Sequence, residues 1–163
     1  MEEESSILFP FAVEDVCPSL FSSEFVYSSV KKCNLYSISQ EKLKFSVKIG
    51  NDDTLSTKSL SIQPSAHPLI YYMTHPNGLL AIDFRTSSPN TLYSKKNYCQ
   101  LQRIDGDWNH YILADDHEFG ICDIRNPAVY NQCWRYTGIL KKLDCYQTKD
   151  SNAVDFYILI PVV

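Results

Sequence analysis

The segment 42–62 constrains the fold more than any other part of the chain. Over 42–49, Leu43, Phe45, Val47 and Ile49 alternate strictly with lysines and one serine, and Gly-Asn-Asp-Asp at 50–53 then breaks the pattern. A period of two places the apolar side chains on one face, as in a half-buried β-strand, whereas a helix has a period near 3.6. Together with the Thr/Ser/Leu/Ile-rich run that follows, the turn residues predict one hairpin over 42–62.

Similar apolar runs, bounded by turn residues, recur along the chain. The runs at 69–73 and 79–84 flank a His-Pro-Asn-Gly turn, the run at 96–104 precedes an Asp-Gly-Asp turn, and 154–163 is a C-terminal apolar run. Turn signals every ~8–15 residues between β-branched and aromatic runs indicate antiparallel sheets. We therefore predict a mainly β or α+β fold, an antiparallel sandwich or barrel of roughly nine strands with one or two short helices.

Two segments are helix candidates. In 18–32 a proline stands at an early position and two lysines stand at the end, although the centre of this segment equally suits a strand. In 126–138, Asn126 could cap a helix that Pro127 begins and Gly138 ends. The alternative is a turn at Asn126-Pro127 followed by a strand, so 127–137 stays open between helix and strand. No internal repeat is visible.

Length and composition indicate one globular domain over 1–163. Hydrophobic residues make up 44% of the chain and aromatic residues 13%, which excludes the composition of a disordered protein. The first six residues hold three glutamates and no basic residue, so we expect a flexible acidic leader at 1–6. This start does not resemble a secretory signal, and no apolar run approaches the ~20 residues of a membrane span. We expect an intracellular, cytoplasmic protein.

The net charge, the cysteine spacing and the absence of catalytic motifs limit the functions that we expect of the chain. The net charge of −4 lacks the basic footprint of a nucleic-acid-binding protein, so nucleic acid is an unlikely partner. None of the six cysteines forms a C-x-x-C pair, and we expect reduced thiols that behave as small buried apolar groups. The chain has no nucleophile elbow, P-loop, dinucleotide fingerprint or H-E-x-x-H motif. We therefore favour a non-enzymatic protein without a cofactor.

The strongest compositional asymmetry lies at 104–124. This segment contains six acidic residues and two histidines but neither lysine nor arginine, so its formal charge is −6 in a chain of net −4. If its loops and strand ends lie side by side, it forms a concentrated negative surface. The candidate binding residues, which include one tryptophan for aromatic contact, are Asp105, Asp107, Trp108, His110, Asp115, Asp116, His117 and Glu118.

Part of this segment matches the spacing of a calcium loop. Asp105, Asp107 and Asn109 occupy positions 1, 3 and 5 of that pattern, and Asp116 occupies position 12. However, position 6 is His110 instead of glycine, and position 12 lacks the bidentate glutamate. These four residues are weak metal-ligand candidates, and we do not predict an EF-hand.

The sequence thus favours a binding protein that engages a protein partner through an acidic and aromatic surface around 105–118, a surface that would suit a basic partner. One alternative is a β-barrel carrier of a small apolar ligand, which would need a lined internal cavity. A metal-dependent enzyme is the third hypothesis, and it would need histidines and carboxylates converging on a pocket.

Overall fold

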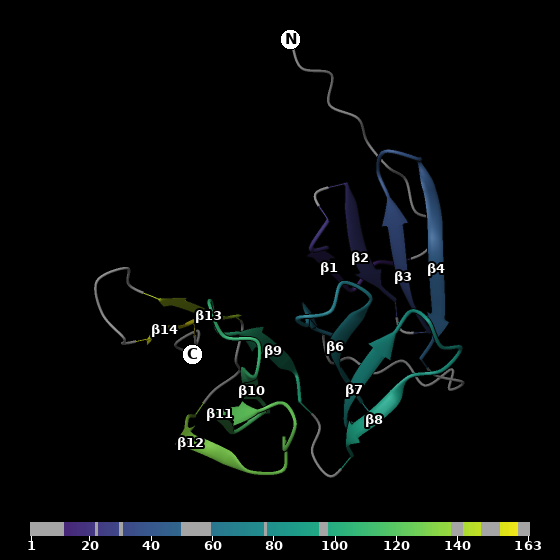
Figure 1. Cartoon of the computed structure of the whole chain (residues 1–163). Coiled ribbons are helices and arrows are strands. Elements are labelled where there is room, and N and C mark those ends of the chain that lie inside the picture. The colour runs from purple at the N-terminus through teal and green to yellow at the C-terminus, as the bar shows by residue number, and fades with distance from the viewer. Residues whose placement is uncertain are drawn as a thin grey trace.

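The computed structural model describes residues 12–21, 23–29, 31–49, 60–76, 78–94, 98–137, 142–147 and 154–159, the last two ranges by their backbone alone. In these ranges every helix or strand assigned is a β-strand (Figure 1). Sheet A comprises β1 (Asp15–Pro18), β2 (Glu24–Ser28), β3 (Lys32–Ser37) and β4 (Lys42–Lys48). Sheet B comprises β5 (Ile62–Pro64), β6 (Ile70–His75), β7 (Gly78–Asp83) and β8 (Asn90–Tyr93).

Two further sheets follow. Sheet C comprises β9 (Gln100–Arg103), β10 (His110–Ala114), β11 (Glu118–Asp123) and β12 (Tyr130–Arg135), and sheet D comprises β13 (Lys142–Gln147) and β14 (Val154–Leu159). All pairs are antiparallel, and within each sheet the strands that follow one another in the sequence pair with one another. The first strands of successive sheets lie against one another, β1 against β5, β5 against β9 and β9 against β13. In Figure 1 the sheets follow one another along an arc.

The mainly β, antiparallel prediction is confirmed, and the finer architecture is corrected. The sheets are open meanders and do not close into a barrel, the described ranges hold fourteen strands instead of about nine, and they hold no helix. The turns at 75–78 and 105–107 do join strands as predicted, β6 to β7 and β9 to β10. The roughly nine-strand estimate was too low because strands of only three or four residues, such as β5 and β8, leave too little alternation to recognise.

Neither helix candidate is a helix in the described residues, and in each segment the structure has the strand that was left open as the alternative. Within 18–32 the chain forms the end of β1 and then β2, in which Phe25 packs against Tyr36 of β3 while Val26 points into the core. Within 126–138 the chain turns at Asn126, whose N–H donates to the Asp123 carbonyl at 2.8 Å, and then forms β12. Cross-strand burial of alternate side chains overrides the local capping signals in both segments.

The hairpin predicted over 42–62 is wrong. β4 pairs with the preceding strand, β3, while Ile62 begins β5 and pairs with Met73 of β6 in the next sheet. Residues 50–59, which contain the predicted turn, lie outside the described residues. The alternating pattern identified a strand correctly, but an alternating pattern does not specify which strand is the neighbour.

The three four-stranded sheets are structural repeats. After the third strand of each sheet, a backbone N–H donates to a carbonyl just before the second strand: Ile38 to Ser23 (2.8 Å), Phe84 to Leu69 (2.9 Å) and Ile124 to Asn109 (2.8 Å). Two of the sheets add an Asp-x-Arg clamp, in which the arginine Nε and backbone N–H both donate to the aspartate. The clamps are Asp83 with Arg85 and Asp123 with Arg125. Sheet A has Ser37 and Ser39 in these places, so few positions keep the same residue and the sequence did not show the repeat.

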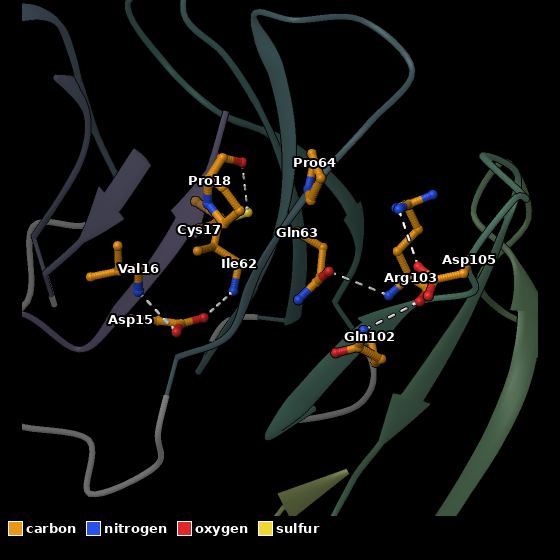
Figure 2. Close-up of a pocket in the computed structure, with 10 residues that line it drawn as sticks. All are labelled: Asp15, Val16, Cys17, Pro18, Ile62, Gln63, Pro64, Gln102, Arg103 and Asp105. Atoms are coloured by element: carbon orange, nitrogen blue, oxygen red, sulfur yellow. Dashed lines mark hydrogen bonds and ion pairs between the residues drawn. The ribbon is translucent and has the colours of Figure 1, made fainter. Parts of the chain in front are cut away.

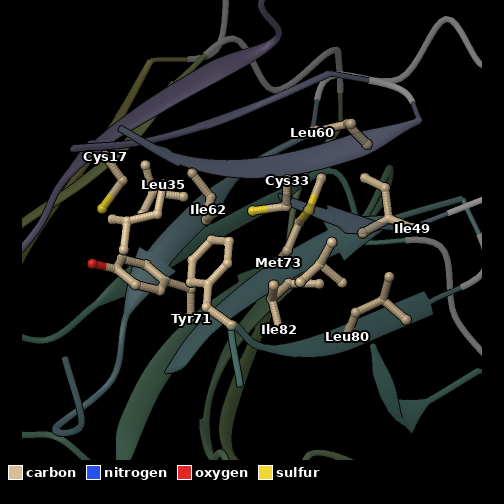
Figure 3. Packing of buried hydrophobic residues seen from close by; sticks show 13 residues of the cluster. Cys17, Cys33, Leu35, Ile49, Leu60, Ile62, Tyr71, Met73, Leu80 and Ile82 are labelled. Carbon is tan, nitrogen blue, oxygen red and sulfur yellow. The ribbon is translucent and has the colours of Figure 1, made fainter. Parts of the chain in front are cut away.

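The hydrophobic core lies between the sheets. Cys33 and Leu35 of sheet A pack with Tyr71, Met73 and Ile82 of sheet B, and Figure 3 shows these side chains gathered between the strands. The opposite face of sheet B packs on sheet C through a second cluster, Leu79, Tyr98, Leu101, Tyr111, Leu113, Cys122 and Ile124. Sheet B is therefore covered on both faces, which explains the near-continuous apolar run in β6.

The two Asp-x-Arg clamps predict acid-sensitive stability. Hydrogen bonds from Arg85 and Arg125 lower the pKa of Asp83 and Asp123 to about 2. A carboxylate whose pKa is lower in the folded state stabilises the fold above its unfolded pKa, so this contribution is lost as pH falls from about 4 towards 2. Asp83→Asn with Asp123→Asn should flatten the pH dependence of the melting temperature in that range. The effect should be modest, because both arginines are exposed and solvent screens such pairs.

Thermal unfolding followed by circular dichroism between pH 2 and pH 7 measures this effect. Asp105→Asn is the matched control, because Asp105 is an exposed carboxylate outside both clamps. A double clamp variant with the pH profile of the unaltered chain would contradict the prediction.

Candidate functional site

Strand β10 divides the predicted acidic surface into two parts. Asp105, Asp107, Trp108 and the start of β10 at His110 lie at one end, while 115–118 lies at the other. Five residues of extended chain separate the two ends by roughly 17 Å. The structure therefore forms two separate groups, which we call the β9–β10 end and the β10–β11 end.

Both carboxylates at the β9–β10 end have partners within that end. The Arg103 guanidinium donates to Asp105 Oδ1 at 3.3 Å and lies 4.2 Å from the centre of the Trp108 ring. His110 Nδ1 lies 2.7 Å from Asp107 Oδ2. Burial alone would raise the pKa of Asp107, but hydrogen bonds from the Asn109 and His110 backbone and from the His110 ring outweigh it, and the net pKa is lowered. These contacts hold the turn together.

The weak metal candidates do not converge. Asp105, Asp107 and Asn109 share the β9–β10 turn, whereas Asp116 lies beyond the far end of β10. Within the part of the chain that the structure describes, no three His, Cys, Asp or Glu side chains are placed to hold a metal ion.

The β10–β11 end combines carboxylates with an exposed aromatic ring. Asp115 Oδ1 accepts hydrogen bonds from the backbone N–H groups of His117 (2.8 Å) and Glu118 (2.9 Å), which fixes the tight turn. Asp116 and His117 are exposed. Next to this turn, the Trp134 ring of β12 stacks on Phe119 at 5.2 Å and remains 38% exposed. Acidic and aromatic groups are thus adjacent at this end.

Hydrogen bonds join the residue that follows β12 to the same turn. The Tyr136 N–H donates to the His117 carbonyl at 2.9 Å, and the Tyr136 hydroxyl donates to the Asp115 carbonyl. In the ladder, Arg135 lies opposite Glu118 and Trp134 lies opposite Phe119. The carboxylates of the turn therefore lie at the end of an outer strand of sheet C.

A pocket of about 200 Å³ lies where the first strands of three sheets meet (Figure 2). It is lined by all of β1, all of β5 and the end of β9, and Asp105 lies at its rim. Its polar side chains are Asp15, Gln63, Gln102, Arg103 and Asp105. A volume of this size is below the ~300–1,000 Å³ of pockets that hold drug-sized ligands.

Side chains in and beside this pocket join one sheet to the next. Asp15 Oδ2 accepts from the Ile62 N–H at 2.8 Å, and Ser61 Oγ donates to the Leu101 carbonyl at 2.9 Å. In both cases a residue at or just before the start of a first strand binds the backbone of the next first strand; we call these contacts latches. Burial raises the pKa of Asp15, and the N–H groups of Ile62 and Val16 partly offset this. The pocket lining is thus largely structural.

Sequence reasoning found Asp105 but missed the rest of the pocket. Asp15, Gln63 and Arg103 are far apart in the chain, and β5 has only three residues. Pro18 and Pro64, which end β1 and β5, were the available signal, since proline is tolerated in a strand where no ladder N–H is needed.

The cysteines agree in part with the prediction. Five are described, and none of these five takes part in a disulfide. Cys17, Cys33 and Cys122 are buried, and burial raises the pKa of Cys17 and Cys122 to about 12. Cys133, on β12, is exposed and is therefore an exception to the expected burial.

Comparison with known proteins does not assign the chain to a family. No model of a known protein family matches the chain, and a search of curated proteins finds no match. No helix in the described ranges has the length and apolar character needed to cross a bilayer.

Proposed function

We propose that the chain is a non-enzymatic interaction protein that binds a basic protein partner through the β10–β11 end. One observation supports this end above the other: the exposed Trp134 ring lies beside the turn that carries Asp115, Asp116 and Glu118. Tryptophan is enriched among the residues that contribute most of the binding energy at protein interfaces. A surface whose charges are all negative attracts a positively charged partner. The net charge of −4 favours the same kind of partner.

The architecture supports a scaffold role. Successive four-stranded antiparallel meanders, with their first strands adjacent, are typical of β-propeller blades. The spacings of 46 and 40 residues between Ile38, Phe84 and Ile124 are close to the period of such repeats. Repeat scaffolds commonly present surfaces for binding. We include in the proposal an intracellular, cytoplasmic location, no cofactor and no role for nucleic acid.

The two other functions have less support. The carrier of an apolar ligand was expected to be a closed barrel, whereas the sheets are open, and half of the residues that line the pocket of about 200 Å³ are polar. A metal-dependent enzyme would need converging ligands, and the described residues do not supply them.

Charge reversal at one end tests the proposal. Asp116→Lys should lower recovery of the partner by roughly three- to tenfold, because it replaces an attractive charge with a repulsive one. The measurement is quantitative mass spectrometry of proteins captured from cells by the tagged full chain. Asp105→Lys is the matched control at the β9–β10 end and should change recovery less than about twofold. Unchanged recovery with Asp116→Lys, or loss with Asp105→Lys alone, would overturn the assignment of this end.

A further inference from the structure

The pocket where the first strands meet has the size of a small ligand. Its volume of about 200 Å³ exceeds the ~150 Å³ of an engineered protein cavity that holds benzene, so a single ring with a small substituent fits. Ligand sites commonly lie where structural units meet. Here β1, β5 and β9, one strand from each of sheets A, B and C, all contribute side chains.

The backbone of Arg103, at the end of β9, faces this pocket. β9 lies at one edge of sheet C and pairs with β10. Just after β9, the Ile104 N–H donates to the His110 carbonyl, which is on the β10 side. Backbone direction alternates along an antiparallel strand, so the N–H and C=O groups of Arg103 both point away from β10. The contacts that they make come from the pocket side.

Two glutamines make these contacts. Gln63 Oε1, from β5, accepts from the Arg103 N–H at 3.5 Å, and Gln102 Nε2 donates to the Arg103 carbonyl at 3.3 Å. An N–H donates only to the carboxamide oxygen, and a carbonyl accepts only from the nitrogen, so the two contacts determine how both carboxamides are oriented. Among the residues that the structure describes, the Gln63 NH₂ group and the Gln102 oxygen have no hydrogen bond. In Figure 2 both of these ends turn away from the Arg103 backbone.

A hydrogen-bond donor and an acceptor in one pocket complement an amide group, which has one of each. We propose that this pocket binds a small uncharged molecule with a carboxamide on a ring, whose carbonyl accepts from Gln63 and whose N–H donates to Gln102. Val16, Pro18 and Pro64 supply apolar surface for the ring. This site is separate from the β10–β11 end and does not depend on the proposed function.

Charged ligands of the same shape fit this arrangement less well. Asp15 and Asp105 are acidic lining residues, and the Arg103 guanidinium is engaged by Asp105 at 3.3 Å. A carboxylate in place of the carboxamide would be repelled by the two acids and would bring no N–H for Gln102. An amidinium would be attracted by the acids but would bring no acceptor for Gln63.

Three ligands of nearly the same shape test the site. Benzamide, benzoate and benzamidine each carry a planar group on one ring, and benzamide alone has both an acceptor and a donor. In NMR titrations of the full chain, benzamide should bind at least about fivefold more tightly than benzoate. Equal binding of the two, or no binding of benzamide at millimolar concentration, would overturn the proposal.

Gln63→Glu should change the ligand preference in a way that a purely structural role would not. The variant keeps an oxygen for the Arg103 N–H, but it replaces the donors with a second acceptor. Two acceptors suit benzamidine, which donates from both nitrogens, so the ratio of benzamide to benzamidine affinity should fall at least about tenfold. Gln132→Glu, on β12, is the matched control, because it makes the same charge change outside the pocket. An equal ratio in the two variants would overturn the role of Gln63.

The unaltered chain provides a measurement that does not depend on any variant. Benzamide should shift the side-chain amide resonances of Gln63 and Gln102 and leave that of Gln132 in place. Unchanged Gln63 and Gln102 resonances at the highest benzamide concentration would overturn the site, even if Gln63→Glu fails to fold.

A peptide probe distinguishes a small molecule from an amide side chain of a protein. N-acetyl-Gly-Gln-Gly-amide carries the same carboxamide on a flexible chain, and it should bind more weakly than benzamide because it has no ring for the apolar wall. Tighter binding of this peptide, lost when its glutamine is replaced with glutamate, would show that the pocket takes a side chain and that a small-molecule ligand is the wrong assignment.

Discussion

Replacing Gly78 with alanine is expected to destabilise the protein by at least about 3 kcal/mol. Gly78 begins β7 with a backbone φ of +116°, a conformation that side-chain-bearing residues adopt only under strain. A Cβ at this position would lie 1.9 Å from the Tyr93 carbonyl oxygen, which belongs to the paired strand β8. Because the Cβ is fixed to the Cα of residue 78 and the oxygen belongs to the β8 backbone, neither can move without disturbing strand pairing. Urea unfolding followed by circular dichroism measures the loss.

Gly106→Ala is the control for the conformational part of this effect. Gly106 also has a positive φ, +78°, but it lies in the turn between β9 and β10 instead of within a strand. Its replacement should cost about 1 kcal/mol, as expected for φ alone. A Gly78→Ala protein within about 0.5 kcal/mol of the unaltered chain would show that β7 and β8 do not approach this closely.

Truncation of Tyr111 is expected to have the second large effect. The side chain is fully buried between sheets B and C, its ring meets Tyr72 edge-on at 5.2 Å, and its hydroxyl donates to the Pro64 carbonyl at 2.8 Å. Tyr111→Ala removes the ring and leaves a cavity, which should cost about 3–5 kcal/mol. Tyr111→Phe keeps the ring but leaves the Pro64 carbonyl without this donor, which should cost about 1–2 kcal/mol.

Comparing Tyr111→Ala with Tyr111→Phe separates the stability due to packing of the ring from the stability due to the hydroxyl hydrogen bond. Chemical unfolding of both variants should give a larger loss for alanine than for phenylalanine, with the difference due to packing. Equal losses would show that the hydrogen bond to β5 dominates, and two losses below about 0.5 kcal/mol would contradict burial of Tyr111 at a sheet interface.

The sequence predicted where strands occur better than it predicted which strands pair with one another. The β6–β7 hairpin was found because an Asn-Gly turn stands between two long apolar runs. In contrast, the alternating run at 42–49 forms an outer strand, where Leu43 and Phe45 remain partly exposed. Alternation reports which side chains share a face, but membership of a sheet depends on contacts far away in the chain. For the same reason Asn126-Pro127 resembled a helix start but begins the turn before β12.

The candidate site was predicted in composition but not in arrangement. Asp105 and Asp116 both lie in the acidic segment, and a count of charges cannot show that a strand of five residues separates them. Trp134 is not among the predicted site residues, because its exposure depends on the position of β12 as an outer strand of sheet C. Whether a strand stands at the outside of a sheet is a property of backbone pairing, and no single residue type marks it.

The latches from Asp15 to Ile62 and from Ser61 to Leu101 run in one direction along the chain. In each, the side chain comes from the earlier sheet and the strand it holds comes from the later one. Every sheet also uses only consecutive strands, so its pairing needs no residue from downstream. During synthesis each sheet therefore leaves the ribosome after the sheet on which it packs. The sheets can then assemble one by one while the chain is still being made.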